Sequence, residues 1–197
     1  MTAKTVEAPD WSSAPDWSSI PAPPDDGAAA HLLGAKLPAV PLPATSGSSI
    51  DLSALPGRTV LYAYPRTSQP GADNPAGWDM IPGARGCSPQ SCEFRDHYNE
   101  LRRLGVDRVF GLSTQDTAYQ QEAAERLHLP FPLLSDAAGT LTQALDLPTF
   151  EAAGMTLLRR FTLIIDGGTV THIFYPVFPP DRNAADVVAW LSQHAGP

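Results

Sequence analysis

The sequence is short of cysteine and has no long apolar run. Only two of its 197 residues are cysteines, too few for the disulfide framework of a small secreted domain, so we expect a reducing, cytoplasmic setting. No run approaches the ~18 consecutive apolar residues of a membrane span. The N-terminus lacks the basic region and apolar stretch of a secretory signal, so we expect neither export nor a membrane partner.

Positive charge is scarce as well. The chain has 13 Lys and Arg against 21 Asp and Glu, a net charge of −8, which argues against nucleic acid or an anionic membrane surface as a partner. The five histidines are scattered and form no second ligand pair for the cysteines, so we expect no bound metal. They are His31, His97, His128, His172 and His194.

The composition of the N-terminal segment differs from that of the rest. Residues 1–33 hold many prolines and few aliphatic residues, too little apolar surface to offset the entropy of ordering, so we expect a disordered arm. The hexapeptide Ala-Pro-Asp-Trp-Ser-Ser occurs twice in tandem within residues 8–19. Its Trp11 and Trp17 could dock on a surface or a partner, although we expect a solvated tail. Residues 34–197 are enough for one folded domain.

Apolar runs and helical periodicities alternate through that domain. Edge strands, a central strand, a helix after the cysteines, a parallel strand, further helices, a Gly-Gly hairpin and a final helix follow one another. This order predicts an α/β fold of the thioredoxin-like type, with a mixed central sheet and helices on both faces. Besides the cysteine helix, the predicted segments are the strands 39–42, 49–52, 58–64 and 107–113, the helix 116–128, the extended segment 131–135, the helix 137–146, the hairpin strands 160–166 and 169–175, and the helix 181–194.

An irregular segment separates the first central strand from the two cysteines. Residues 66–86 are rich in Pro and Gly, and loops this long inside a compact domain are usually functional or mobile. Helical spacing resumes after Cys92, so we expect a helix that begins at Ser88 or Pro89, where the missing N–H of proline is tolerated. Cys87 therefore lies at or just before a helix N-terminus, where orphan N–H groups and the macrodipole favour a thiolate.

The spacing of the two cysteines limits any disulfide between them. Five residues along a helix correspond to a rise of roughly 7.5 Å, beyond the ~7 Å at which Cα atoms can be bridged without backbone movement. A Cys87–Cys92 disulfide would therefore require the first helical turn to unwind, as in a redox device that changes shape. The alternative is that one or both are buried structural thiols.

Five blocks of sequence form an ordered series. They are Val60–Pro65, Gly86-Cys87-x4-Cys92 with Phe94-Arg95-Asp96, Val109–Thr114, Phe131–Asp136 and Arg160–Asp166. In this order they resemble the peroxiredoxins, and within them the Q-type group, also called bacterioferritin comigratory proteins, over about residues 34–192. The resemblance implies that Cys87 is the peroxidatic and Cys92 the resolving cysteine of an atypical two-cysteine enzyme.

The resemblance also implies roles for Pro65 and Arg160. Pro65 would shield the sulfur and limit its over-oxidation, although it also ends the strand. Arg160 would favour the thiolate and stabilise the transition state; its alternative is a surface ion pair. Only one of Arg160 and Arg159 can face the site, because neighbouring residues of a strand point to opposite faces.

The sequence departs from the family pattern at one position. The family carries a Thr or Ser four residues after its proline and three before its cysteine. Here Pro65 and Cys87 are 22 positions apart and Ala84 stands three before the cysteine. We expect Thr67, with Ser68 as the alternative, to supply the hydroxyl from before the insertion, and the insertion to cover or reshape the entrance.

The function that the resemblance implies is reduction of hydrogen peroxide or an organic hydroperoxide. A Cys87 sulfenic acid would condense with Cys92, and a thioredoxin-like dithiol would reduce the disulfide. The resemblance implies no haem, flavin or metal, and a monomer. A general thiol-disulfide oxidoreductase would want C-x-x-C at the helix start. A non-catalytic binding or redox-sensing module, with the tryptophans of the arm as its contact, stays open.

Overall fold

A five-stranded mixed sheet forms the centre of the protein. The computed structural model describes residues 16–194, and the strands of its main sheet run in the order β5-β4-β3-β8-β9. The β3 strand is central, parallel to β4 and antiparallel to β8, so the predicted mixed sheet is present. Its strands are β3 (Arg58–Ala63), β4 (Arg108–Ser113), β5 (Leu133–Ser135), β8 (Phe161–Asp166) and β9 (Thr169–Phe174).

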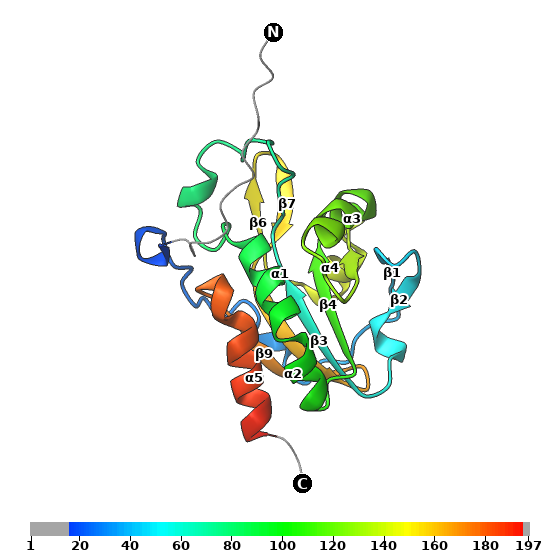
Figure 1. The fold of residues 1–197 in the computed structure, drawn as a ribbon. Coiled ribbons are helices and arrows are strands. Elements are labelled where there is room, and N and C mark those ends of the chain that lie inside the picture. The colour runs from blue at the N-terminus through cyan, green and yellow to red at the C-terminus, as the bar shows by residue number, and fades with distance from the viewer. Residues whose placement is uncertain (1–15, 195–197) are drawn as a thin grey trace.

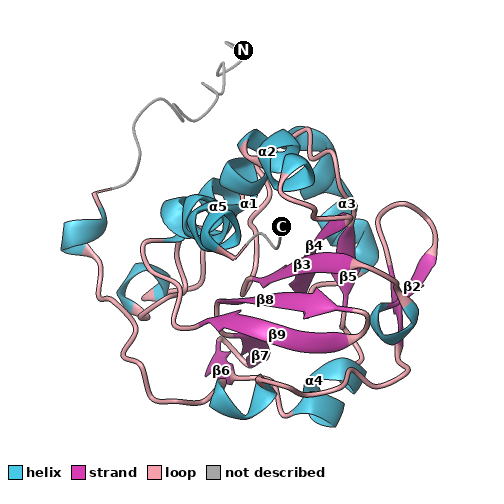
Figure 2. Cartoon of the chain, turned by 90° about the horizontal axis from the view of Figure 1, so that it is seen from below, coloured by secondary structure: helices cyan, strands magenta, loops and turns pink. Residues whose placement is uncertain are grey.

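Strand alternation divides the core into two layers. On β3 and just after it, Val60, Tyr62 and Tyr64 point into the layer under α1, α2 and α5, while Leu61 and Ala63 point into the layer on the other side, as the two-residue period of a strand requires. Figure 2 shows α1 and α5 above the sheet and α4 below it. The helices are α1 (Cys87–Asp96), α2 (Tyr98–Arg103), α3 (Thr117–Arg126), α4 (Thr140–Leu145) and α5 (Asn183–Gln193).

The cysteine helix is shorter than the sequence predicts. The apolar spacing indicates one helix through Leu104, but the structure divides it at His97, whose φ of −90° and ψ of 1° leave the helical region. The ring nitrogen Nδ1 of His97 lies 3.1 Å from the Glu93 carbonyl oxygen, to which the His97 N–H also donates. The break therefore comes where a side chain shares a backbone acceptor of the helix.

Two small antiparallel hairpins flank the main sheet (Figure 1). One pairs β1 (Pro41–Pro43) with β2 (Ser49–Asp51), the two short strands predicted before the central sheet. The other pairs β6 (Thr149–Ala152) with β7 (Met155–Leu158) and was not predicted. The Trp78 indole of the inserted loop, in the 3-10 turn η4 (Trp78–Met80), is buried against this second hairpin. The loop of residues 66–86 is thus packed at this point.

The prediction of a disordered arm through residue 33 is wrong for residues 16–33. Leu32, the last residue of the 3-10 turn η2 (Ala30–Leu32), is completely buried in the main core. The carboxylate of Asp26 pairs with Arg159 at 2.8 Å and accepts from the Tyr175 hydroxyl at 2.7 Å. These contacts join residues more than 100 positions apart, so local composition does not reveal them. The part of the arm that includes Trp11 lies outside the described residues.

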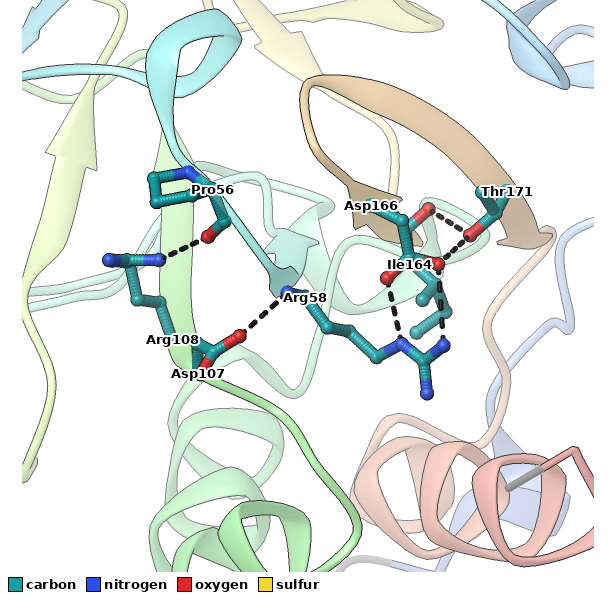
Figure 3. A network of polar contacts seen from close by, with 7 residues as sticks. All are labelled: Pro56, Arg58, Asp107, Arg108, Ile164, Asp166 and Thr171. Carbon is teal, nitrogen blue, oxygen red and sulfur yellow. Dashed lines mark hydrogen bonds and ion pairs between the residues drawn. The ribbon is translucent and has the colours of Figure 1, made fainter. Parts of the chain in front are cut away.

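The sheet is locked in register by a polar network at the end away from the cysteines (Figure 3). Arg58 Nε donates to Asp166 Oδ1 at 2.9 Å, across the register pair of β3 and β8. The Arg58 N–H donates to Asp107 Oδ2 at 2.8 Å, and Thr171 Oγ1 donates to Asp166. At the other end of the same two strands Ala63 lies opposite Phe161. Arg160, the residue before Phe161, contacts Cys87 of α1 there.

We expect Phe94→Ala to lower the free energy of unfolding by about 3–5 kcal/mol. The Phe94 ring is fully buried and stacks on Tyr62 with 4.3 Å between the ring centroids, so its removal leaves a cavity between α1 and the sheet. Urea denaturation measures the change. Leu33→Ala is the control, because Leu33 is 60% exposed and its loss should cost no more than about 0.5 kcal/mol. Similar losses for both variants would contradict this account of the core.

Candidate active site

Cys87 is the first residue of α1, so the helix begins one residue before the predicted start at Ser88 or Pro89, and the cysteine lies at the helix N-terminus as expected. Gly86 precedes it with φ of +105° in the left-handed region, a conformation that glycine adopts at little cost. The Cys87 thiol is unpaired and 4% exposed, and it packs in the core layer that holds Tyr62 and Tyr64. A nucleophilic sulfur is therefore held at a helix N-terminus with little access to water.

The Arg160 guanidinium lies beside this sulfur. Its Nη2 is 3.3 Å from Cys87 Sγ and also 3.2–3.4 Å from the carbonyl oxygens of Gly83, Ala84 and Arg85. The thiol in turn lies 3.7 Å from the Ala84 carbonyl. The last residues of the inserted loop thus form a row of acceptors that holds the positive charge next to the sulfur.

Gln90 holds the other side of the guanidinium. Its Oε1 accepts from Arg160 Nη1, and its Nε2 donates to Asn183 Oδ1 at 2.9 Å. Thr162 Oγ1 donates to the same Asn183 oxygen at 2.7 Å. All these side chains are buried. Sequence reasoning missed Gln90 and Asn183; the available signal was that Gln90 follows Cys87 by three residues, which places both on one helix face.

Within residues 16–194, one donor of Arg160 has no acceptor. The Nε atom is buried and makes no hydrogen bond there, while Nη1 and Nη2 are both engaged. Arg159 points elsewhere: it contacts Asp26, and its Nε donates to the Thr149 carbonyl at 3.0 Å. Of the two arginines, the structure places Arg160 at the sulfur.

The structure does not bring the expected hydroxyl to the sulfur. The Thr67 hydroxyl and backbone N–H both donate to Gln115 Oε1, at 3.3 and 2.8 Å, and the Ser68 hydroxyl donates to Asn74 Oδ1 at 2.6 Å. Thr67 and Ser68 are thus held by residues other than Cys87. The insertion separates both from the α1 N-terminus along the chain, and position 84 contributes only its backbone. Pro65 is buried just after β3, and its carbonyl accepts from Ser113 Oγ at 3.0 Å.

Cys92 lies in the second turn of α1 and is also unpaired. Partial burial raises the pKa of its thiol, against the opposing effect of the nearby Arg95 guanidinium. The next residue, Glu93, accepts at Oε2 from the Ala184 N–H at 2.9 Å, which caps the start of α5. Burial raises the pKa of the Glu93 carboxyl to about 7, although this hydrogen bond acts in the opposite direction.

A cavity of about 240 Å³ reaches Arg160. Its walls come from the N-terminal segment, the inserted loop, the β6–β7 hairpin and the segments before β8 and after β9. They are mostly apolar but include Asp26 and Arg159, and Cys87 does not line them. A larger cavity, of about 580 Å³, is lined by neither Cys87 nor Arg160. Among residues 16–194, no three His, Cys, Asp or Glu side chains gather to hold a metal ion, and no helix is long and apolar enough to cross a membrane.

Comparison with known proteins identifies the class. Residues 32–189 match the Redoxin family. Peroxiredoxin Q of the rice chloroplast is 30% identical over 160 residues, which cover 80% of this chain and 65% of the rice protein. Peroxiredoxin Bcp of Escherichia coli K12 is 29% identical over 80% of this chain and 94% of its own length. The chain thus spans about two thirds of the plant relative and nearly all of the bacterial one.

Solved structures agree with this result. Peroxidoxin BcpB of Mycobacterium tuberculosis is 27% identical with a TM-score of 0.64, over 82% of this chain and 96% of that one. Peroxiredoxin Q of Xanthomonas campestris is 25% identical with a TM-score of 0.63, over 82% and 97%. The thioredoxin-like fold is confirmed. The chain belongs to the redoxin family, in the group of peroxiredoxin Q and Bcp proteins.

We expect the stability of the protein to depend on the protonation of Glu93. The carboxyl has a pKa near 4.5 when unfolded and about 7 when folded. Because the folded-state pKa is raised, this contribution is fully present below about pH 4.5 and is lost as the pH rises through 7. The difference in unfolding free energy between wild type and Glu93→Gln, measured by urea denaturation from pH 4.5 to 8, should therefore decrease with pH. A difference independent of pH would refute the assignment.

Proposed function

We propose that this protein is a thiol-dependent peroxidase that reduces hydrogen peroxide or an organic hydroperoxide. The observation that carries the proposal is the 3.3 Å contact between Arg160 Nη2 and the Cys87 sulfur at the N-terminus of α1. A guanidinium and a helix N-terminus both stabilise a thiolate, which is the nucleophilic form of cysteine. Membership in the peroxiredoxin Q and Bcp group supports the same reaction.

In the first step the Cys87 thiolate attacks one peroxide oxygen. The new S–O bond forms as the O–O bond breaks, and the second oxygen leaves as hydroxide or alkoxide and takes up a proton. Negative charge spreads over the sulfur and both oxygens, so fixed donors in a dry site lower the barrier. Arg160 and the N–H groups of the first turn of α1 supply these donors. The unpartnered Nε of Arg160 leaves one charged donor for a further oxygen acceptor.

Arg160 contributes more to stabilising the transition state than the family pattern implies. Ala84 stands where the pattern has a hydroxyl, and the Thr67 hydroxyl donates to Gln115. We assign Thr67 to holding the loop after β3. Pro65 keeps its proposed role of shielding the sulfur from solvent. The apolar cavity beside Arg160 is the proposed route of the peroxide to the site.

In the second step Cys92 resolves the oxidised Cys87. Its sulfur attacks the sulfenic sulfur, an intramolecular disulfide forms and water leaves. Both thiols are free in a wound helix in the present structure, so this step requires the start of α1 to unwind. A thioredoxin-like dithiol then restores both thiols by exchange. Because both cysteines lie in one chain, we propose that a monomer completes the cycle, in a reducing compartment such as the cytoplasm.

The cysteine variants test this cycle. We expect Cys87→Ser to consume no peroxide, because it lacks the nucleophile. Cys92→Ser should undergo one fast oxidation and then stop, because the sulfenic acid has no partner. Intact mass and free-thiol titration after one equivalent of hydrogen peroxide measure both, and peroxide consumption with thioredoxin and its reductase measures turnover.

Three outcomes would contradict the proposal. Wild-type thiols that persist for minutes in micromolar peroxide would favour a non-catalytic binding or sensing module. Efficient reduction of a protein disulfide without peroxide turnover would favour a general thiol-disulfide oxidoreductase. Full turnover of Cys92→Ser with thioredoxin would remove its resolving role.

A substitution of the arginine tests the electrostatic part. We expect Arg160→Lys to slow oxidation of Cys87 by about 10²–10³-fold, the usual effect of losing one preorganised donor, because an ammonium cannot contact Gln90, the carbonyl row and the sulfur together. Arg159→Lys is the matched control and should change the rate less than about fivefold, since its partner Asp26 is a surface residue. Stopped-flow oxidation of the reduced proteins measures both. Equal decreases in the oxidation rate for Arg160→Lys and Arg159→Lys would contradict the electrostatic role and leave Arg160 a role in folding alone.

A further inference from the structure

The second copy of the repeated hexapeptide reaches the active-site helix. Trp17 begins the 3-10 turn η1 (Trp17–Ser19), and its indole lies against the backbone of Gly86, the residue before Cys87. A Cβ built on Gly86 would be 2.7 Å from Trp17 Cη2 and 2.3 Å from Pro180 Cγ. Both distances are shorter than real Cβ contacts, so the two rings pack directly on the peptide that leads into the reactive cysteine.

The indole is anchored on its far side as well. Trp17 Nε1 donates to Asp181 Oδ2 at 2.7 Å, in the 3-10 turn η5 (Pro180–Arg182) that precedes α5. The ring also meets Phe178 edge to face, with centroids 6.1 Å apart. Trp17 is thus held between the start of α1 and the segment before α5.

The repeated sequence encodes the turn that presents the indole. Asp16 Oδ1 accepts from the Ser18 N–H at 3.0 Å and from its hydroxyl at 2.6 Å, and the Ser19 hydroxyl donates to the Asp16 carbonyl at 2.8 Å. The Asp and both Ser residues of Asp-Trp-Ser-Ser therefore fold the backbone around Trp17. The identical first copy contains Trp11 and lies outside the described residues.

We propose that Trp17 is a positioning residue that keeps the first turn of α1 wound and so slows formation of the Cys87–Cys92 disulfide. The inference rests on the proposed function. Unwinding of α1 moves Gly86 and Cys87, and the packing of Trp17 on Gly86 must then break. The hydrogen bond and ring contacts of Trp17 go to Asp181, Phe178 and Gly86, so it acts on the step that needs movement and not on the attack on peroxide.

The step that Trp17 controls can be written in full. The Cys92 sulfur bonds to the Cys87 sulfur, the S–O bond of the sulfenic acid breaks, and the hydroxide leaves as water with the proton of the Cys92 thiol. A second hydroperoxide molecule competes by oxidising the waiting sulfenic acid to sulfinic acid. A longer wait gives more of that product, so Trp17 also increases the sensitivity of Cys87 to excess peroxide.

Rapid-quench kinetics on the full chain test the proposal. Reduced protein is mixed with hydrogen peroxide, quenched with acid and followed by intact mass, which separates sulfenic acid, disulfide and sulfinic acid. We expect Trp17→Ala to form the disulfide about tenfold faster, a change of ~1.4 kcal/mol in the barrier, and to form sulfenic acid at the wild-type rate. Sulfinic acid at high peroxide should decrease. Trp17→Phe keeps a ring but loses the hydrogen bond to Asp181. Its rate of disulfide formation should lie between those of wild type and Trp17→Ala.

Two controls make the result specific. Trp11→Ala removes the same side chain from the first copy of the hexapeptide and should leave both rate constants unchanged. Diamide, a thiol oxidant that needs no peroxidase chemistry, should also close the disulfide faster in Trp17→Ala. This second route separates the proposed peroxidase activity from the proposed role of Trp17. If peroxide forms no disulfide but diamide forms it faster in Trp17→Ala than in wild type, only the peroxidase activity is refuted. Disulfide rates within about twofold of wild type by both routes, or equal changes in both steps with peroxide, would overturn the role of Trp17.

Discussion

The site depends on the burial of one positive charge. Arg160 is 3% exposed, and a guanidinium removed from water is tolerated only when acceptors surround it. Three consecutive carbonyls at the end of the inserted loop, the Gln90 side chain and the Cys87 sulfur provide them. The same acceptors determine where the charge sits. The conformation of the loop before α1 and the electrostatics of the sulfur are therefore one constraint.

In the proposed cycle, the start of α1 has to satisfy two opposed requirements. It must hold Cys87 beside Arg160 while peroxide reacts, and it must release Cys87 before Cys92 can reach it. The helix is tied to the start of α5 twice, through Gln90 to Asn183 and through Glu93 to the Ala184 N–H. Both ties are hydrogen bonds between elements that keep their own structure. They can break without unfolding the sheet, so the helix can be firmly placed and still open locally.

What the sequence predicts well is what local signals encode. The apolar run along 58–64 and the Gly-Cys-x-Pro start of α1 depend on neighbouring residues, and the strand and the helix N-terminus lie within one residue of where they were expected. The β6–β7 hairpin was missed although it has a local signal. Its turn residues, Ala153 and Gly154, both have positive φ, as a two-residue hairpin turn requires, but an Ala at the first position conceals the pattern.

The remaining errors come from contacts that are distant in sequence. Residues 16–33 have the composition of a disordered segment, yet Asp26 pairs with Arg159 and Leu32 packs in the core. The residues next to Asp26 and Leu32 in the chain do not indicate these distant partners. The buried polar network has the same origin: Gln90 gains its role only because β8 and α5 bring Arg160 and Asn183 to it. Sequence reasoning predicted the pair of Cys87 and Arg160, which are in contact in the structure, but not the residues that orient the arginine.

The inserted loop contributes both to the surroundings of Arg160 and, with the N-terminal segment, to the cavity beside it. Trp78 is buried against β6 and β7, so the extra loop has a small apolar core of its own. Its last residues then return to Arg160 and supply the carbonyl row, whereas Ile81 and Pro82 line the cavity opposite Pro23. As the proposed route of the peroxide, a mostly apolar cavity with a charged donor in its wall would select by size and polarity before any bond is made. The inserted loop and the N-terminal segment line this cavity together with Phe150, Tyr175 and Pro176.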